Sequence, residues 1–378
     1  MSKTIETYKF EVIIIGAGII GLAVANALTQ DFDNVLVIDK ESSFGRHVSS
    51  RNSEVIHSGI YYQSDSLKAK LCVAGNQMMY DFCHQYSIEH NNCGKLIISP
   101  NKSGLYQLEE LLLNGEKNRV SNLNIITKDK VQSKEPLITC EAALSVPSAG
   151  IVDSHGVMKK LEYLINSKGS STIYNMAVND IVKIEDIYRL SFVNVNYYAE
   201  SKIIINAAGL WSDVIANMIG IDEDVIANMI GIDDYKIHYC KGEYYQTSLF
   251  RNQVNSLIYP LPTQYSSGIH IVLRLDNTIG FGPSAHYTDE IEYSISDKHK
   301  YEFLEHLNTF FKIDEKDLSE DFSGIRPKLQ GPGDSASDFI IVNEERKGHK
   351  NFINLLGIDS PGLTSSLAIG EYVRKLII

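Results

Sequence analysis

Three glycines and one aspartate near the start of the chain are spaced for binding a dinucleotide. Gly16, Gly18 and Gly21 form a GxGxxG motif, and Asp39 follows 18 residues after the last glycine. The first glycine permits a tight turn, the second lets the backbone approach a pyrophosphate, and the third lets a helix pack closely on the preceding strand. The aspartate is placed to accept hydrogen bonds from ribose hydroxyls. This pattern predicts a dinucleotide site, but it does not separate NAD from FAD.

The segments around this motif have the pattern of a Rossmann βαβ unit. The β-branched run at 10–15 predicts a strand buried on both faces, residues 22–29 predict a helix, and 35–38 predict a second strand that ends at the acid. The N-terminus of the helix offers unpaired N–H groups and a positive dipole end to a phosphate. We therefore expect Ile19, at the start of the helix, and Lys40, next to the acid, to be part of the same site.

Two later segments predict that the chain returns to this site. The apolar run at 202–206 ends in the small residues Ala207, Ala208 and Gly209, which allow close passage beneath a nucleotide. The run at 352–356 leads into a glycine loop and then a helix. A cofactor cradle assembled from three distant segments favours FAD over NAD.

The rest of the chain predicts a second, mostly β region. From 235 to 287 the pattern consists of alternating strands punctuated by glycine, proline and tyrosine, and 190–198 also predicts a strand. Residues 65–90, 105–117 and 297–311 predict helices, whereas 150–156 predict a turn. The fold class expected is α/β plus β, a discontinuous Rossmann-type FAD-binding domain with an interleaved, mostly antiparallel β domain. Its boundaries are expected at 1–85, 148–234 and 322–378 for the FAD domain, and at 86–147 and 235–321 for the substrate domain.

Composition restricts the partners. The 378 residues are 44% hydrophobic and 22% charged, as in ordinary globular proteins, and carry a formal net charge of −12, which disfavours nucleic acid. Five cysteines without a CxxC motif indicate reduced thiols, and no metal-ligand spacing occurs, so we expect no metal. No secretory signal or membrane span is predicted. We expect a cytoplasmic protein, and a peripheral contact with the inner face of a membrane stays open.

A ten-residue segment occurs twice. Residues 213–222 (DVIANMIGID) recur unchanged at 224–233. A repeat offset of 11 residues corresponds to three helical turns, so a helix could absorb the insertion in phase. We interpret it as a local surface duplication.

With these segments assigned, the chain resembles the L-2-hydroxyglutarate dehydrogenase/oxidase family of the D-amino-acid-oxidase-like flavoproteins. The resemblance extends over nearly the whole chain. It is carried by RNSEVIHSGIYY (51–62), NAAGLWSD (206–213), KGEYY (241–245), GIRPKLQGPG (324–333) and GIDSPGLTSSLAIG (357–370). Asp39 departs from the glutamate usual in the superfamily, a conservative change for ribose binding.

The resemblance implies further cofactor contacts. It places the middle segment and Trp211 beside the cofactor and the C-terminal loop at the isoalloxazine end, where a helix N-terminus would stabilise reduced flavin. Expected contacts are Ser49, Arg51, Asn52, Ala208, Gly209, Trp211, Gly357, Pro361, Gly362, Leu363 and Thr364.

The reaction implied is oxidation of a 2-hydroxy acid to a 2-oxo acid, with hydride transfer to flavin N5. A histidine base suits proton removal near neutral pH. His57 is the first candidate because it follows the apolar pair Val55-Ile56 and precedes Ser58-Gly59, which indicates the end of an element near the flavin. His270, on an alternating strand, is the second, and His155 is weaker.

An anionic substrate requires cations. Arg326 matches the position where related amino-acid oxidases hold the substrate carboxylate, and an arginine fork suits a carboxylate. Lys328, Arg274 and Lys241 are candidates for a distal carboxylate, and Tyr62 and Tyr244 for the pocket wall. The electron acceptor implied is quinone or oxygen. Open alternatives are an amino-acid or amine oxidase of the glycine/sarcosine type, a glycerol-3-phosphate dehydrogenase, and a flavin protein without turnover.

Overall fold

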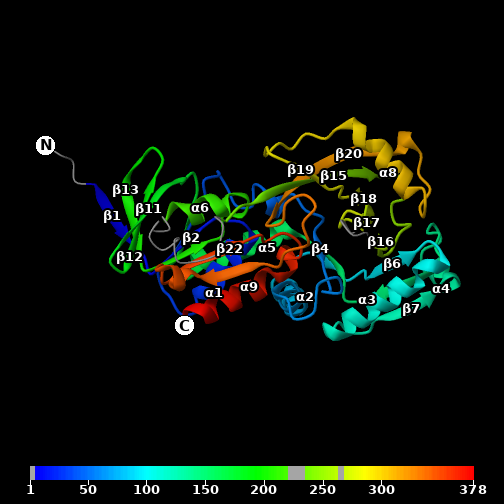
Figure 1. The fold of residues 1–378 in the computed structure, drawn as a ribbon, viewed down its shortest axis with the longest axis horizontal. Helices are drawn as coiled ribbons and strands as arrows, with labels where there is room; N and C mark the ends of the chain where they lie inside the picture. Colours follow the sequence, from blue (N-terminus) through cyan, green and yellow to red (C-terminus); the bar gives the residue numbers. More distant parts are fainter. Residues whose placement is uncertain (1–4, 220–234, 263–267) are drawn as a thin grey trace.

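The structure is a computed structural model that describes residues 5–219, 235–262 and 268–378. Its first main sheet is built from buried β-branched strands collected from both ends and the middle of the chain (Figure 1). The strand order is β10 (Ser171–Ile173), β3 (Val35–Ile38), β2 (Val12–Ile15), β14 (Ile203–Asn206), β22 (Phe352–Leu356) and β21 (Ile340–Asn343). All neighbours in this sheet are parallel except β21 and β22. The three-segment cradle therefore begins as three adjacent strands, β2, β14 and β22.

Long helices pack against this sheet and against one another. They are α1 (Ile19–Leu28), α2 (Leu67–Tyr86), α5 (Ser154–Ser167) and α9 (Gly362–Ile377). Helix α9 packs on both α1 and α2, and glycines permit the close crossings. A Cβ at Gly75 would clash with the backbone carbonyl of Thr364. The first turn of α9 is thereby fixed beside α2.

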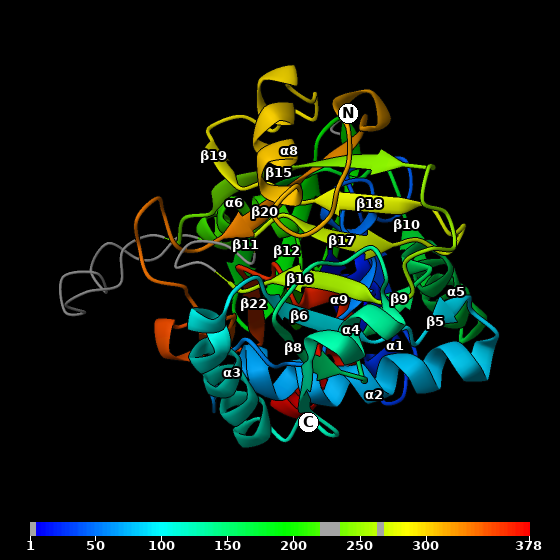
Figure 2. The same cartoon turned by 90° about the vertical axis from the view of Figure 1, so that its right-hand side faces the viewer.

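The second main sheet is larger and mostly antiparallel. Figure 2 shows β15, β18, β17, β16, β6 and β8 side by side in that order. The strands are β6 (Lys95–Ser99), β7 (Asn124–Thr127), β8 (Ala142–Val146), β15 (His238–Thr247), β16 (Leu257–Pro260), β17 (His270–Leu273), β18 (Ile279–Gly282), β19 (His286–Thr288) and β20 (Ser319–Lys328). Helices α3 (Leu105–Lys117), α4 (Lys128–Lys134) and α8 (Lys300–Leu307) accompany them. The predicted fold class is confirmed.

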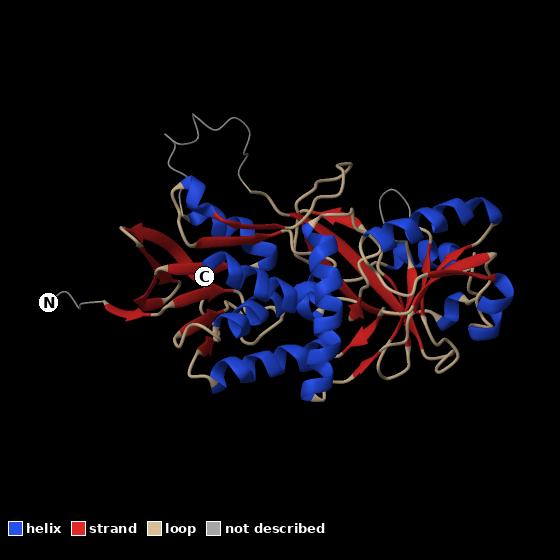
Figure 3. Cartoon of the chain, turned by 90° about the horizontal axis from the view of Figure 1, so that it is seen from below, coloured by secondary structure: helices blue, strands red, loops and turns tan. Residues whose placement is uncertain are grey.

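Two smaller sheets are also present in the described part of the chain. One contains β1 (Glu6–Lys9), β13 (Val195–Ser201), β12 (Ile187–Phe192) and β11 (Val178–Ile184), and the other β4 (Val55–Ile56), β9 (Gly150–Val152) and β5 (His90–Asn91). Figure 3 shows the first at the end of the molecule that carries the N-terminus, with long helices between it and the larger sheet. None of the described helices is long and apolar enough to cross a membrane.

Several predicted elements differ in the structure. The strand expected over 190–198 is divided by a hairpin turn in which Asn194 has φ 59°, so β12 and β13 pair antiparallel. The turn expected at 150–156 is strand β9 followed by α5, whose first turn is capped by Asp153. The first decapeptide copy begins in α6 (Ser212–Met218), whereas the second copy lies outside the described residues.

Strand β20 lies across a predicted domain boundary. The expected boundary at residue 322 would assign its second half to the nucleotide domain, but β20 pairs with β15 from Ser319 to Lys328. Backbone hydrogen bonding to β15 therefore places this whole strand in the larger sheet. It also carries Arg326 and Lys328 toward the space between the two main sheets.

Candidate active site

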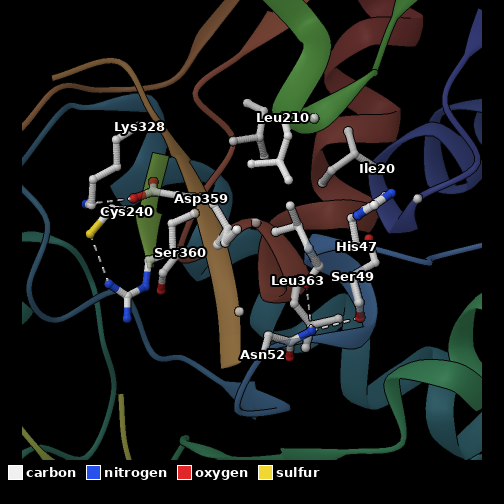
Figure 4. Close-up of a pocket in the computed structure, with 18 of the residues that line it drawn as sticks. Ile20, His47, Ser49, Asn52, Leu210, Cys240, Lys328, Asp359, Ser360 and Leu363 are labelled. Carbon is white, nitrogen blue, oxygen red and sulfur yellow. Dashed lines mark hydrogen bonds and ion pairs between the residues drawn. The ribbon is translucent and has the colours of Figure 1, made fainter. Parts of the chain in front are cut away.

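A cavity of about 1120 Å³ lies where the carboxyl ends of the parallel strands meet the larger sheet. Figure 4 shows Ser49 and Asn52 at one end and Lys328, Asp359 and Ser360 at the other. The predicted site residues that line it are Gly16, Gly18, Ile19, Asp39, Lys40, Ser49, Arg51, Asn52, His57, Tyr62, Ala208, Gly209, Trp211, Tyr244, His270, Arg326, Lys328, Pro361, Gly362 and Leu363. Residues predicted from the GxGxxG motif and from the five motifs of the resemblance thus meet at one cavity.

The glycine motif forms a turn that a larger residue would disrupt. Gly16 has φ 112°, and a Cβ there would clash with the backbone carbonyl of Ala207 in the middle segment. A Cβ at Gly21 would clash with the carbonyl oxygen of Gly16, so Gly21 acts through packing and does not line the cavity. Gly18 is the N-cap residue of α1. This surface lets a ligand approach the backbone, as a dinucleotide requires.

Asp39 secures the same turn. Its Oδ2 atom accepts a hydrogen bond from the Ala17 N–H at 2.7 Å, and Oδ1 accepts one from the Glu41 N–H at 2.9 Å. The amine of neighbouring Lys40 lies 3.6 Å from the centre of the Trp211 ring. The second strand, the glycine turn and the middle segment are therefore linked around one part of the cavity.

The loop after β3 forms another wall of the cavity. Ser49 Oγ accepts from the Ile19 N–H at 2.9 Å, and Asn52 donates to the Ser49 carbonyl at 2.8 Å. The Arg51 guanidinium lies 4.1 Å from the centre of the Tyr293 ring. The loop therefore contacts the start of α1 through Ser49 and contacts Tyr293 through Arg51.

His47 in this loop was missed by sequence reasoning. Its Nδ1 lies 2.8 Å from the Tyr293 hydroxyl and Nε2 lies 2.9 Å from Glu41. Hydrogen bonds from Lys40 and His47 lower the pKa of Glu41 to about 2. The imidazole also packs edge-on against Trp211. No motif signal marked His47, since its partners come from remote segments.

The C-terminal loop supports the cavity partly from behind. Gly357 has φ 66° and a Cβ there would press on Leu329, while Thr364 is fully buried, and neither residue lines the cavity. Thr364 Oγ1 accepts from the His57 N–H at 2.9 Å and donates to the Val55 carbonyl at 3.3 Å. Thr364 therefore fixes the backbone of the candidate base.

His57 is held on several sides. Its carbonyl accepts from the Asn76 amide at 2.9 Å. Ring atom Nε2 lies 3.3 Å from Ser360 Oγ, and Nδ1 lies 3.5 Å from Lys95 Nζ. Burial, and then the charges of Lys95 and His270, keep the pKa of His57 well below its ordinary value. The imidazole is consequently neutral at physiological pH, as a proton acceptor must be.

His270 presents a second neutral imidazole. Nδ1 lies 2.9 Å from the Gly268 carbonyl, so Nδ1 carries the proton and Nε2 holds a lone pair. Among the residues described, that Nε2 atom has no hydrogen-bond partner. Burial lowers the pKa of His270 to about 3, and the ring stacks on Tyr259 with 3.7 Å between centres. His270 can therefore accept a hydrogen bond from a ligand.

Arg326 offers a positive charge to the cavity. Its guanidinium donates to the Ser284 carbonyl at 2.8 Å and to Cys240 Sγ at 3.4 Å. In the described ranges it forms no salt bridge. Arg326 and His270 both line the cavity. An anion bound by Arg326 would thus share the cavity with a neutral imidazole.

Lys328 differs from Arg326 because its charge is shared with an internal acid. The Asp359 carboxylate forms salt bridges with Lys328 Nζ at 3.1 Å and with Lys68 Nζ at 2.8 Å. Asp359 is 8% exposed. Burial opposes ionisation of Asp359, but the two lysines hold its pKa below the ordinary value. Asp359 lies in the motif at 357–370 and Lys68 in the helix predicted over 65–90. The sequence predicted no role for either side chain.

The two tyrosines predicted to line the pocket have hydroxyl partners. Tyr62 lies 3.4 Å from Ser360, and Tyr244 lies 3.0 Å from Ser53. Ser360 therefore lies between His57 and Tyr62. Ser360 belongs to the GIDSPG motif, but the sequence analysis predicted no contact for it.

Two predicted substrate ligands, Lys241 and Arg274, do not line the cavity. Lys241 pairs with Glu292 and does not line the cavity, because its neighbour Cys240 faces Arg326 and successive strand residues point to opposite faces. Arg274 pairs with Asp321 in a separate pocket of about 160 Å³. It lies four residues beyond His270, roughly 13 Å along the chain.

His155 also has a structural setting. It lies with Glu54 and Asp153 in a cluster of possible metal ligands. Asp153 caps α5 by accepting from the Gly156 N–H, and Glu54 accepts from the Ser154 hydroxyl at 2.7 Å. The carboxylates therefore serve to start the helix, and the cluster gives no reason to assign an ion.

Comparison with known proteins identifies the family. The sequence profile of the FAD dependent oxidoreductase (DAO) family matches residues 11–376. The mitochondrial L-2-hydroxyglutarate dehydrogenase of Arabidopsis thaliana is 32% identical over 99% of this chain and 84% of that protein. The L-2-hydroxyglutarate dehydrogenase of Indibacter alkaliphilus is 30% identical over 96% of this chain and 98% of that protein.

A solved structure supports the fold. L-α-glycerophosphate oxidase of Mycoplasma pneumoniae, with FAD bound, has a TM-score of 0.86 at 23% identity and covers 98% of this chain and 94% of its own. At this identity the likeness concerns the fold alone. The glycine turn, the start of α1 at Gly18 and the cavity at the strand ends fit the cofactor that the family profile names. The chain belongs to the FAD dependent oxidoreductase family, as its resemblance predicted, and FAD is its cofactor.

Proposed function

We propose that this enzyme oxidises L-2-hydroxyglutarate to 2-oxoglutarate and passes the electrons to a quinone or to oxygen. Relatives named L-2-hydroxyglutarate dehydrogenase, at 27–32% identity over 96–99% of the chain, support this substrate. The supporting structural observation is Arg326. Its guanidinium reaches the cavity with no carboxylate partner in the described chain, so an anionic substrate would supply the missing partner.

The proposed roles follow from the contacts. Bound FAD would supply the acceptor for the hydride from C2 of the substrate. Arg326 binds the carboxylate next to that carbon. His57, neutral and held by Thr364 and Asn76, removes the hydroxyl proton through Nε2. His270 binds the substrate through its free Nε2 lone pair and is the alternative base.

Lys328 is proposed to contact the distal carboxylate, with part of its charge already shared with Asp359. We also propose that FAD contacts Gly16, Gly18, Asp39, Ser49 and the other predicted cofactor residues that line the cavity. Gly21, Gly357 and Thr364 take a supporting role, because they lie outside the cavity lining. We likewise propose the division into an FAD domain and a substrate domain, with β20 assigned to the latter.

The test is an anaerobic substrate screen followed by flavin absorbance. L-2-Hydroxyglutarate should bleach the oxidised flavin, whereas D-2-hydroxyglutarate, glycine, sarcosine and glycerol 3-phosphate should not. Bleaching by an amino acid or by glycerol 3-phosphate instead would replace the substrate assignment. Absence of bleaching with every compound would favour a flavin protein without turnover. Reoxidation by air with hydrogen peroxide release, compared with reoxidation by a soluble quinone, then separates the two acceptors.

A further inference from the structure

Lys95 is a buried lysine placed directly behind the candidate base. Lys95 is the first residue of β6 and is 1% exposed. Its Nζ atom lies 3.5 Å from His57 Nδ1. The same amine lies 3.9 Å from the ring centre of Tyr259 and 5.4 Å from that of Tyr61. Throughout the described segments, no carboxylate forms a salt bridge with it. A lysine without an acid is seldom this buried.

The groups around Lys95 are uncharged near neutral pH. Burial raises the pKa of the Cys72 thiol on α2 and raises the pKa of the Cys93 thiol to about 11. Burial likewise raises the pKa values of the two tyrosine hydroxyls. The facing histidines are neutral, because burial lowers the pKa values of His57 and His270.

Lys95 is therefore placed to change its charge near neutrality. Burial lowers the pKa of its amine to about 7, and the two neighbouring thiols oppose this shift only in part. At lower pH the residue is an ammonium ion, and at higher pH it is a neutral amine. The two forms differ in what they offer to Nδ1 of His57.

The contact couples the charge of Lys95 to the tautomer of His57. An ammonium group can only donate, so His57 Nδ1 must accept and the proton of the neutral ring lies on Nε2. A neutral amine has a lone pair and can accept the Nδ1–H. In that tautomer Nε2 carries the lone pair on the side of Ser360, which lines the cavity.

We propose that Lys95 is a positioning residue that, as a neutral amine, takes the Nδ1–H of His57 and leaves the Nε2 lone pair free for the substrate hydroxyl. This role rests on the proposed function. When Nε2 receives the hydroxyl proton, the Nδ1 proton moves to Lys95, which becomes an ammonium ion; bound FAD would supply the acceptor for the C2 hydride. The imidazole therefore stays neutral, and the ammonium must lose its proton before the next turnover.

The tautomer is tested by ¹⁵N NMR of the FAD-loaded enzyme labelled at histidine, without substrate. The His57 signals are assigned by their loss in His57→Gln. The proton should move from Nε2 to Nδ1 as the pH rises through about 7. Lys95→Met should remove this pH-dependent exchange. A single tautomer across the range in the parent enzyme, or an unchanged exchange in Lys95→Met, overturns the proposal.

Kinetics provide a second readout. The rate of flavin reduction by L-2-hydroxyglutarate should fall below about pH 7 in the parent enzyme. In Lys95→Met this acid limb should move down by about one pH unit or more, with maximal reduction slowed roughly tenfold and substrate affinity nearly unchanged. Exposed Lys117→Met is the matched control. If the parent flavin is not reduced at all, the proposed substrate fails, and the NMR result still decides the role of Lys95.

Discussion

The hydroxyl of Thr364 accepts a hydrogen bond from the backbone N–H of His57 over 2.9 Å, joining residues that are 307 positions apart. The same hydroxyl donates to Val55, so one side chain satisfies two backbone groups at the end of β4. The first turn of the last helix therefore sets where the candidate base lies. A residue without cavity contact can still control the chemistry through this link.

Thr364→Val tests that link. The substitution keeps the shape of the side chain but leaves two buried backbone groups without partners, so we expect unfolding free energy to fall by about 2 kcal/mol or more. Flavin reduction should slow roughly tenfold because His57 is less well positioned. Urea unfolding and anaerobic reduction measure the two effects. Thr364→Ser retains the hydroxyl and should behave much like the parent. Equal rates for the valine variant and the parent would show that the contact has no positioning role.

Arg326→Gln should weaken substrate recognition and leave FAD in place. Loss of one partner in a desolvated charge pair costs about 2–5 kcal/mol, so kcat/KM should fall by roughly 30- to 5,000-fold. Steady-state kinetics at matched flavin content provide the measurement. Lys241→Gln is the control, since Lys241 lies on the same sheet and pairs with Glu292 outside the cavity. Unchanged KM and kcat in Arg326→Gln would contradict the carboxylate assignment.

Lys95→Met should stabilise the protein in a pH-dependent way. The folded pKa of Lys95 is about 7, and the ordinary value is 10.5. Between these values the unfolded chain binds more protons, so the stability of the parent rises with pH across this window. Methionine removes the cost of burying the cation. Below pH 7 the free energy of unfolding of the variant should therefore exceed that of the parent by about 2–5 kcal/mol. This difference should shrink as the pH approaches the pKa of Lys95 in the unfolded chain.

Thermal unfolding near pH 6 and near pH 9 measures that margin. Lys117→Met, at an exposed position on α3, should show little change at either pH. A margin for Lys95→Met that is equal at both values would mean that Lys95 does not change its charge in the folded state over this range.

Gly16→Ala should reduce FAD retention. Gly16 combines φ 112° with a clash between the added methyl group and Ala207, so the turn would have to open. Gly348→Ala is a matched control, because Gly348 has φ 84° and open space around its Cβ position. Both variants carry backbone strain of about 1–2 kcal/mol, and only the first disturbs the cradle. Flavin absorbance per purified chain should fall in Gly16→Ala alone. Equal FAD content in the two variants would mean that crowding at Gly16 does not limit binding.

Sequence reasoning was most successful where local pattern and function coincide. Gly16 to Gly21 occupy the predicted turn, and of the returning strands β14 lies beside β2 and β22 lies beside β14. Local pattern was less informative about side-chain direction. Lys241 points away from the cavity because of its strand register, and Arg274 lies too far along the chain from His270.

Burial created by distant contacts could not be inferred from local pattern. Lys95 stands at the start of an apolar strand, where a lysine normally marks a solvated end. Its burial comes from His57 and from the rings of Tyr61 and Tyr259, which belong to other segments. Pairing of Asp359 with both Lys68 and Lys328 is similarly a product of the tertiary fold.

The assembly of the cofactor cradle from β2, β14 and β22 has a consequence for biosynthesis. Helix α9, which begins at Gly362, packs on α1 and α2 and carries the contact to His57. During synthesis the glycine turn precedes β14, β22 and α9, so the cradle cannot close before α9 has been made. We therefore expect stable flavin capture to require that α9 has been synthesised and has packed on α1 and α2.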